Sequence, residues 1–229
     1  MAIIKKYKSI IIEKHQLSSD VFSLVIKSLG KPFKYHPGQF LHLALDAIDF
    51  SEQWPESRCF SIQSSPSEDN IKITFAVKGR FTKRMVNEIF KGSQVFIKLP
   101  YGDLFTQDHN RNNVVFIAGG TGVTPFLSLF SDYRFSLYSG AKLFLGLKKK
   151  ELNFYSDLLD VARINNPDFD IKIYYEGING FISVQEVIEH DNNDNVFFIS
   201  GPPMMIKYYK NELTKNNISI ERIITDDWE

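Results

Sequence analysis

The sequence has almost no cysteine, no surplus of charge and no long hydrophobic run. Cys59 is the single cysteine among 229 residues, which excludes a disulfide framework, a multi-cysteine zinc site and an iron–sulfur cluster held by this chain alone. Lysine plus arginine number 27, and so do aspartate plus glutamate. The chain therefore has no net positive charge that would attract it to nucleic acid or to an anionic membrane. No run approaches the roughly 18 apolar residues of a membrane span, and residues 1–14 are followed by neither the long uncharged apolar region nor the small-residue cleavage site of a secretory signal. We therefore expect a cytoplasmic protein with no nucleic-acid partner and no membrane span.

The first half of the chain has the pattern of an antiparallel β-structure. Hydrophobic residues make up 43% and charged residues 24% of the 229 residues, which suits two globular domains. Short β-rich runs alternate with turn residues at intervals typical of a barrel or a sandwich. One amphipathic helix is expected over residues 82–90, with Thr82 as its cap. The expected strands are 7–13, 21–27, 39–45, 59–61, 71–77 and 94–99.

The pattern changes after the polar stretch 107–113. Compact apolar runs, of the kind that a parallel sheet buries on both faces, then alternate with helical segments. This predicts βαβ units in a Rossmann-like, doubly wound parallel α/β sheet. We therefore expect an N-terminal domain over residues 1–108 and a C-terminal α/β domain over residues 113–229. The expected strands are 114–118, 142–147, 171–175, 196–200 and 220–225, and the expected helices are 125–132, 152–164, 184–189 and 203–216.

A glycine-rich turn follows the first buried strand of the second half. It reads Gly119-Gly120-Thr121-Gly122-Val123-Thr124-Pro125. Glycines let the backbone approach a pyrophosphate closely, and a helix start favours an anion. Thr124 suits an N-cap and Pro125 a first helical position. The alternative is an ordinary tight turn, which seldom needs three glycines in four residues. The turn therefore favours a nucleotide site, although Pro125 replaces the third glycine of the strict dinucleotide fingerprint.

Three further segments carry candidate site residues. In 58–61, strand alternation places Arg58 and Phe60 on one side and Cys59 and Ser61 on the other, where a guanidinium can bind phosphate and a hydroxyl can bond a ring heteroatom. Segment 77–82 joins a strand to a helix start and offers a second anion site. Segment 199–205 ends a buried strand, where open α/β sheets bind ligands. Each segment also has an interpretation without a ligand: 58–61 as an exposed strand face, 77–82 as the end of a strand, and 199–205 as a helix start shaped by prolines.

In their order along the chain, these segments resemble the ferredoxin-NADP reductase superfamily of flavin- and nucleotide-binding oxidoreductases. The resemblance covers nearly the whole chain. It implies a six-stranded antiparallel barrel that binds FAD, a Rossmann-like domain that binds NADH or NADPH, and hydride transfer between stacked rings. The matching segments are His36-Pro37-Gly38-Gln39-Phe40, Arg58-Cys59-Phe60-Ser61 (R-x-Y-S), Gly79-Arg80-Phe81-Thr82, Pro100-Tyr101-Gly102-Asp103-Leu104-Phe105, Gly119 to Pro125 (G-G-x-G-x-T-P) and Gly201-Pro202-Pro203-Met204 (G-P-P-x).

The resemblance also implies residue roles. Arg58 would bind the flavin pyrophosphate, Phe60 would lie on the isoalloxazine ring, and Ser61 would bond near the hydride-accepting nitrogen. Thr121 and Ser200 would lie near the reacting rings. The other implied flavin-binding residues are Cys59, Val77, Lys78, Gly79, Phe81 and Thr82, and the other implied nucleotide-binding residues are Gly119, Gly120, Gly122, Thr124, Pro125, Glu176, Gly201, Pro202 and Met204.

The chain departs from the family pattern at several positions. Phe60 replaces a tyrosine and lacks the phenol's hydrogen bond, and Ser200 stands where many members have a cysteine. Lysines 148–150 could accept a 2′-phosphate, whereas Glu176 would repel it and could bond a free ribose hydroxyl. The balance favours NADH over NADPH. Trp228 would either gate the nicotinamide's place over the flavin or cap the sheet.

Three functions stay open on the sequence. The favoured one is a reductase that passes electrons from bound FAD to an external protein acceptor, such as a ferredoxin, a cytochrome or an oxygenase component. The second is a flavin reductase, in which free flavin is a diffusible substrate. The third is a flavin- or nucleotide-binding sensor or accessory subunit without turnover.

Overall fold

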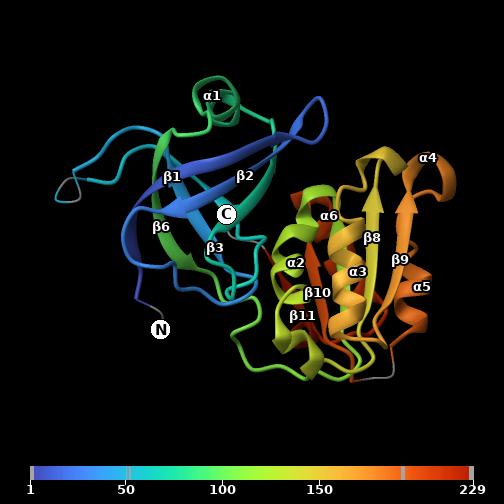
Figure 1. The fold of residues 1–229 in the computed structure, drawn as a ribbon. Coiled ribbons are helices and arrows are strands. Elements are labelled where there is room, and N and C mark those ends of the chain that lie inside the picture. Colours follow the sequence, from blue (N-terminus) through green and yellow to red (C-terminus); the bar gives the residue numbers. More distant parts are fainter. Residues whose placement is uncertain (1–2, 50, 52, 192–193, 227–229) are drawn as a thin grey trace. The chain divides into compact units, whose positions relative to one another are not determined.

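The computed structural model describes residues 3–49, 51, 53–191 and 194–226, so the candidate gate Trp228 lies outside the described residues. Contacts divide the chain into two compact units, residues 1–103 and 104–229 (Figure 1). The division comes before the polar stretch 107–113 because Leu104 and Phe105 are buried in the core of the second unit. There the ring centroid of Phe105 lies 4.9 Å from that of Phe198.

The first unit is a six-stranded antiparallel sheet that curls into a near-barrel. The strand order is β4-β3-β6-β1-β2-β5, which leaves β4 and β5 at the two edges. The predicted antiparallel six-stranded barrel is thus confirmed, and its strands lie where the alternating pattern indicated. Their bounds are β1 (Lys5–Gln16), β2 (Val21–Ser28), β3 (Phe40–Ala44), β4 (Ser57–Ser61), β5 (Ile71–Ala76) and β6 (Gln94–Tyr101).

Alternating side chains of these strands build the core of the barrel. On β1, Tyr7, Ser9 and Ile11 are buried whereas Lys8 is exposed, as the period of a half-buried strand requires. Helix α1 (Arg80–Glu88) packs on the barrel (Figure 1). Its side chains Phe81 and Met85 are buried and join the same core.

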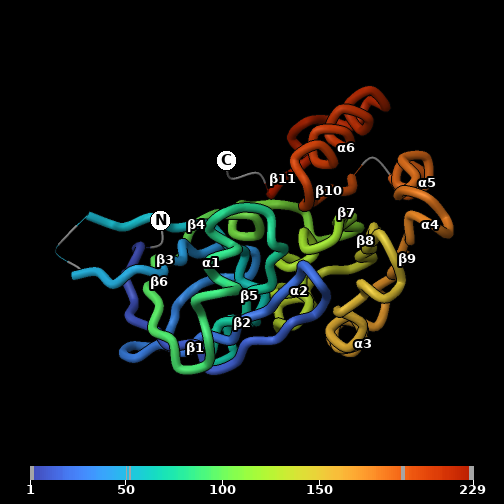
Figure 2. Tube along the Cα trace, turned by 90° about the horizontal axis from the view of Figure 1, so that it is seen from above, coloured from blue at the N-terminus to red at the C-terminus, as the bar shows by residue number. Residues whose placement is uncertain are grey.

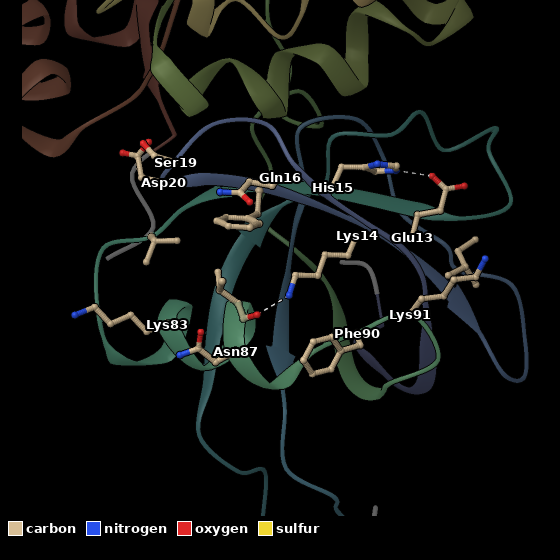
Figure 3. A pocket seen from close by; sticks show the side chains of 14 residues that line it. Glu13, Lys14, His15, Gln16, Ser19, Asp20, Lys83, Asn87, Phe90 and Lys91 are labelled. Atoms are coloured by element: carbon tan, nitrogen blue, oxygen red, sulfur yellow. Dashed lines mark hydrogen bonds and ion pairs between the residues drawn. The ribbon is translucent and has the colours of Figure 1, made fainter.

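The end of α1 is held by Lys14 of β1. Its Nζ donates hydrogen bonds to the carbonyls of Val86 (2.5 Å) and Ile89 (2.7 Å), and it lies 5.1 Å from the ring centroid of Phe90. Figure 3 shows Lys14 in a hollow between the β1–β2 hairpin and α1. Lys83 also lines this hollow. Because cations complement the carbonyl end of a helix, this contact stabilises α1.

The second unit is a five-stranded parallel sheet with the order β11-β10-β7-β8-β9. The chain runs from β7 outward to β8 and β9, then returns to place β10 on the other side of β7. This reversal is that of a doubly wound α/β fold, and the predicted class is confirmed. The strands are β7 (Val115–Gly119), β8 (Lys142–Leu147), β9 (Asp170–Tyr175), β10 (Phe197–Ser200) and β11 (Ile223–Thr225).

Helices cover both faces of this sheet (Figure 2). On one face, α2 (Thr124–Phe130) and α3 (Ser156–Asn165) share a core with alternate residues of the strands. On the other face, α5 (Val184–Glu189) and α6 (Pro203–Lys215) do the same. Among the helices of the described ranges, none is long and apolar enough to span a membrane.

Some element boundaries differ from the sequence expectations. Helix α1 begins at Arg80, so Thr82 is its third residue rather than its cap. A 3-10 turn, η1 (Gly120–Val123), precedes α2, which makes Thr124 the first helical residue and not the N-cap. The hydroxyl of Thr82, at the third helical position, accepts a hydrogen bond from the amide of the N-cap residue Gly79, and the hydroxyl of Thr124 donates to the Thr121 carbonyl in the preceding turn. The helix expected over 152–164 is η3 (Lys150–Leu152) followed by α3, and the strand expected over 220–225 is η4 (Ile220–Arg222) followed by β11.

Candidate cofactor sites

Two glycine-containing turns meet at the carboxyl edge of the parallel sheet. Gly119 ends β7 and Ser200 ends β10, and these strands are neighbours with Ala118 opposite Ser200. A Cβ placed on Gly122 would lie 2.5 Å from the Cα and 2.6 Å from the nitrogen of Gly201. Because these are backbone atoms that cannot rotate away, the two turns pack backbone against backbone. Position 122 has room for glycine only.

These turns lie where the sheet reverses its strand order. From β7 the chain extends to β8 and β9 on one side, and β10 and β11 occupy the other. Open α/β sheets bind ligands outside the carboxyl ends of the strands at such a switch point. Gly120 has a φ of 55°, a left-handed conformation that glycine adopts without strain. The turn therefore has the close backbone approach that a dinucleotide pyrophosphate requires, and Gly120 within it is exposed.

Ser200 has a carboxylate partner that the sequence analysis missed. Its Oγ donates a hydrogen bond to Oδ2 of Asp226 at 3.0 Å, and the Asp226 amide donates to the Ile199 carbonyl at 2.9 Å. Ser200 is only 2% exposed. The carboxylate holds the hydroxyl proton, so Oγ offers its lone pairs to any further partner. Asp226 directly follows the strand next to β10, and that position is the signal that could have identified it.

In the first unit, Arg58 and the start of α1 come together. The Arg58 guanidinium lies 5.3 Å from the ring centroid of Phe81, and Arg58, Lys78 and Gly79 are all exposed. The hydroxyl of Thr82 accepts hydrogen bonds from the amides of Lys78 (3.0 Å) and Gly79 (3.1 Å). Those two amides are therefore engaged within the turn. The cationic side chains and the first amides of α1 are the groups that fit a phosphate here.

The other residues of β4 divide between the faces of the strand. Phe60 is 8% exposed, and its ring meets that of Phe75 edge to face with centroids 5.7 Å apart. Most of this ring thus belongs to the barrel core, and only a margin is open to a flavin. On the opposite face, Cys59 Sγ lies 3.5 Å from Nε2 of His42, and Ser61 is half-buried. Burial raises the pKa of Cys59 and lowers the pKa of His42, so both side chains are neutral at pH 7.

The remaining candidate residues lie in both units. Glu176 begins the short helix α4 (Glu176–Asn179) directly after β9, next to the end of β8, which lysines 148–150 follow. Pro202 is the N-cap of α6, and Met204 in its first turn is 78% exposed. In the first unit, the half-buried Val77 donates its amide to the Asp20 carbonyl at 2.7 Å.

Comparison with known proteins identifies a family. A family model described as an FAD-binding domain matches residues 5–125. The chain is 25% identical over 245 residues to the phenol hydroxylase P5 protein of Acinetobacter pittii (strain PHEA-2), which covers 97% of this chain and 67% of that protein. It is 29% identical over 244 residues to the sulfhydrogenase 2 subunit gamma of Pyrococcus furiosus, and this match covers 96% of this chain and 82% of that protein.

Solved structures share the two-unit fold. A ferredoxin NADP+ reductase from Neisseria gonorrhoeae with bound FAD and NADP superposes with a TM-score of 0.78 at 15% identity, and 99% of each chain is covered. The ferredoxin reductase in carbazole 1,9a-dioxygenase superposes with a TM-score of 0.77 at 19% identity, which covers 99% of this chain and 70% of that one. At these identities, the likeness establishes the fold.

Proposed function

The chain belongs to the ferredoxin-NADP reductase superfamily of FAD- and NAD(P)-binding oxidoreductases, and on this premise we propose that it transfers electrons from NADH through FAD to a separate protein acceptor. The observation that carries the nucleotide half of this proposal is the backbone contact of Gly122 with Gly201 at the switch point of the sheet. An ordinary strand-to-helix turn seldom needs backbone packing this close, whereas a cradle for a pyrophosphate would need it.

The flavin half of the proposal rests on the cationic turn of the barrel unit. Arg58, Lys78 and the start of α1 would bind the FAD pyrophosphate, the open margin of Phe60 would contact the isoalloxazine, and Ser61 would bond a ring nitrogen. When bound, FAD supplies the hydride-accepting chemistry, and the protein's part is to hold and orient the two cofactors. In the second unit, Ser200 and Thr121 would orient the nicotinamide.

Glu176 supports NADH as the electron donor. It is exposed at the end of β9, where an acidic side chain accepts hydrogen bonds from the adenosine ribose hydroxyls and repels a 2′-phosphate. Lysines 148–150 stand at the neighbouring strand end and would favour the phosphate, so the two groups compete. Glu176 and Lys148 each directly follow a strand, β9 and β8 respectively. We propose that the carboxylate dominates because a run of exposed lysines is usually solvated surface.

A protein acceptor is supported by the relatives. Several are named as components or subunits of larger systems. One is the phenol 2-monooxygenase reductase component DmpP of Pseudomonas sp. (strain CF600), which is 26% identical over 249 residues; the match covers 97% of this chain and 67% of that protein. We propose that the acceptor of this chain is likewise a separate oxygenase component or a ferredoxin, with a cytochrome as a further choice.

Purification and turnover test the proposal against its rival. A yellow protein with stoichiometric FAD, which reduces an added ferredoxin or cytochrome when NADH is supplied, is the expected result. The rival is a flavin reductase, and Phe60 favours it, because a largely buried ring without a hydroxyl offers FAD little to hold. A colourless protein that reduces added FAD or FMN but no protein acceptor would establish the rival instead.

A further inference from the structure

Two consecutive methionines at the start of α6 stand in different surroundings. Met204 is 78% exposed. Met205 is half-buried and packs against the core that α5 and α6 share with the sheet. The thioether sulfur of Met205 fills the space beside the two glycine turns. A Cβ on Gly119 would collide with this sulfur, and a Cβ on Gly201 would lie 3.0 Å from it. The sulfur therefore touches both turns of the nucleotide site.

We propose that Met205 is an oxidation site, at which a peroxide converts the thioether to a sulfoxide and thereby weakens nucleotide binding. The inference rests on the proposed function, because it takes the glycine turns as the nucleotide site. It gives Met205 a role that packing alone does not require, since leucine or isoleucine would also fill an apolar gap of this size.

The oxidant is hydrogen peroxide or an organic hydroperoxide. One oxygen atom of the peroxide is transferred to the methionine sulfur, the O–O bond breaks, and the other oxygen leaves as water or an alcohol. Sulfur is oxidised by two electrons and the peroxide is reduced by two. A flavin reductase domain generates such a peroxide itself when two electrons from NADH reach dioxygen instead of the acceptor. The modification would therefore report that the acceptor is missing.

The effect on the site follows from the packing. A sulfoxide is polar and carries an extra oxygen atom on sulfur, so it no longer suits the apolar core against which Met205 packs or the gap beside Gly119 and Gly201 that its sulfur fills. Either the side chain leaves the gap or the two turns separate. Both outcomes disturb the backbone that Gly122 and Gly201 hold in contact, and with it the amides that would bind the pyrophosphate. Met204 is 78% exposed, so an oxygen atom on its sulfur does not disturb this packing.

The test uses the full chain with FAD and measures the Kd for ADP-ribose by calorimetry before and after treatment with hydrogen peroxide. ADP-ribose carries the pyrophosphate but no nicotinamide, so it reports on the glycine turns without turnover. We expect the Kd to rise about tenfold or more, the size of one hydrogen bond to a charged group. Mass spectrometry of the peptide that contains both methionines gives the sulfoxide fraction at each. Methionine sulfoxide reductases should restore the original Kd.

Matched variants assign the effect to one sulfur. Each variant is compared with its own untreated sample, so a change in its starting affinity does not matter. Met205→Leu should keep its Kd under peroxide, and Met204→Leu should lose affinity as the wild type does. The proposal is overturned if Met205→Leu loses affinity equally, or if Met205 in the wild type is oxidised without a change in Kd. An untreated wild type that binds neither ADP-ribose nor NADH would instead overturn the proposed function itself.

Discussion

Gly122→Ala is the substitution that most directly probes the contact between the two glycine turns. The new methyl group would lie 2.5 Å from Gly201 Cα, 2.6 Å from Gly201 nitrogen and 2.6 Å from the Ser200 carbonyl oxygen. All three atoms belong to the backbone at the end of β10, so no side-chain rotation can relieve the overlap. The turns have to separate, which moves the amides of the proposed pyrophosphate site.

The size of the effect follows from overpacking. Inserting a methyl group into a tightly packed region costs about 1–3 kcal/mol, which for a protein of this size lowers Tm by roughly 2–12 °C. We expect the Kd for ADP-ribose to rise by more than tenfold in addition, because the displaced amides would no longer converge on the phosphates. Thermal unfolding and calorimetric titration of the FAD-loaded chain measure the two effects separately.

Gly30→Ala is the matched control for this substitution. A Cβ at Gly30 would meet no atom within 4 Å, so its unfolding free energy should stay within about 0.5 kcal/mol of the wild type and its ADP-ribose affinity should not change. If Gly122→Ala matched Gly30→Ala in both Tm and Kd, the contact would have no role in stability or binding, and the nucleotide site would have to lie elsewhere.

Three further predictions concern single side chains. Lys14→Met should destabilise the first unit by about 1–2 kcal/mol in urea unfolding, because two hydrogen bonds to the last carbonyls of α1 are lost; an unchanged midpoint would contradict the helix-end role of Lys14. His109 is held neutral by burial, which lowers its pKa, with Nδ1 donating to the Gln107 carbonyl and Nε2 accepting from the Tyr138 hydroxyl at 2.8 Å each. Its contribution to stability is present above the unfolded pKa of about 6.5 and is lost as the pH falls from there through the lowered folded value. The unfolding free energy should therefore drop between pH 7 and pH 5 by less in His109→Gln than in the wild type, and an equal drop would refute this. Glu176→Arg should raise kcat/KM for NADPH relative to that for NADH by about tenfold or more. An unchanged ratio would show that Glu176 does not contact the adenosine ribose.

Local patterns in the sequence predicted most of the fold. The β-rich runs of the first half and the apolar runs of the second are dictated by which faces are buried, and this alternation is readable residue by residue. The glycine turn after β7 was equally visible, because its context of strand, turn and helix is local. The helix starts at Thr82 and Thr124 were placed wrongly, since α1 begins earlier, at Arg80 after the extended Gly79, and a 3-10 turn over Gly120–Val123 leads directly into α2 at Thr124.

What the sequence could not supply is the set of contacts between distant segments. Gly122 and Gly201 meet because β7 and β10 are neighbours in the sheet, and nothing near either residue specifies that pairing. The same is true of the Ser200–Asp226 hydrogen bond and of the Met205 sulfur beside Gly119. These contacts depend on strand order, which is a property of the whole fold.

Anaerobic mixing of the FAD-loaded protein with NADH tests the central claim most directly. If the chain passes a hydride from the nucleotide to FAD, the visible absorption band of the flavin should bleach in a single turnover. The rate should saturate with NADH concentration and exceed the rate with NADPH. A band that stays unchanged with both nucleotides would contradict the account.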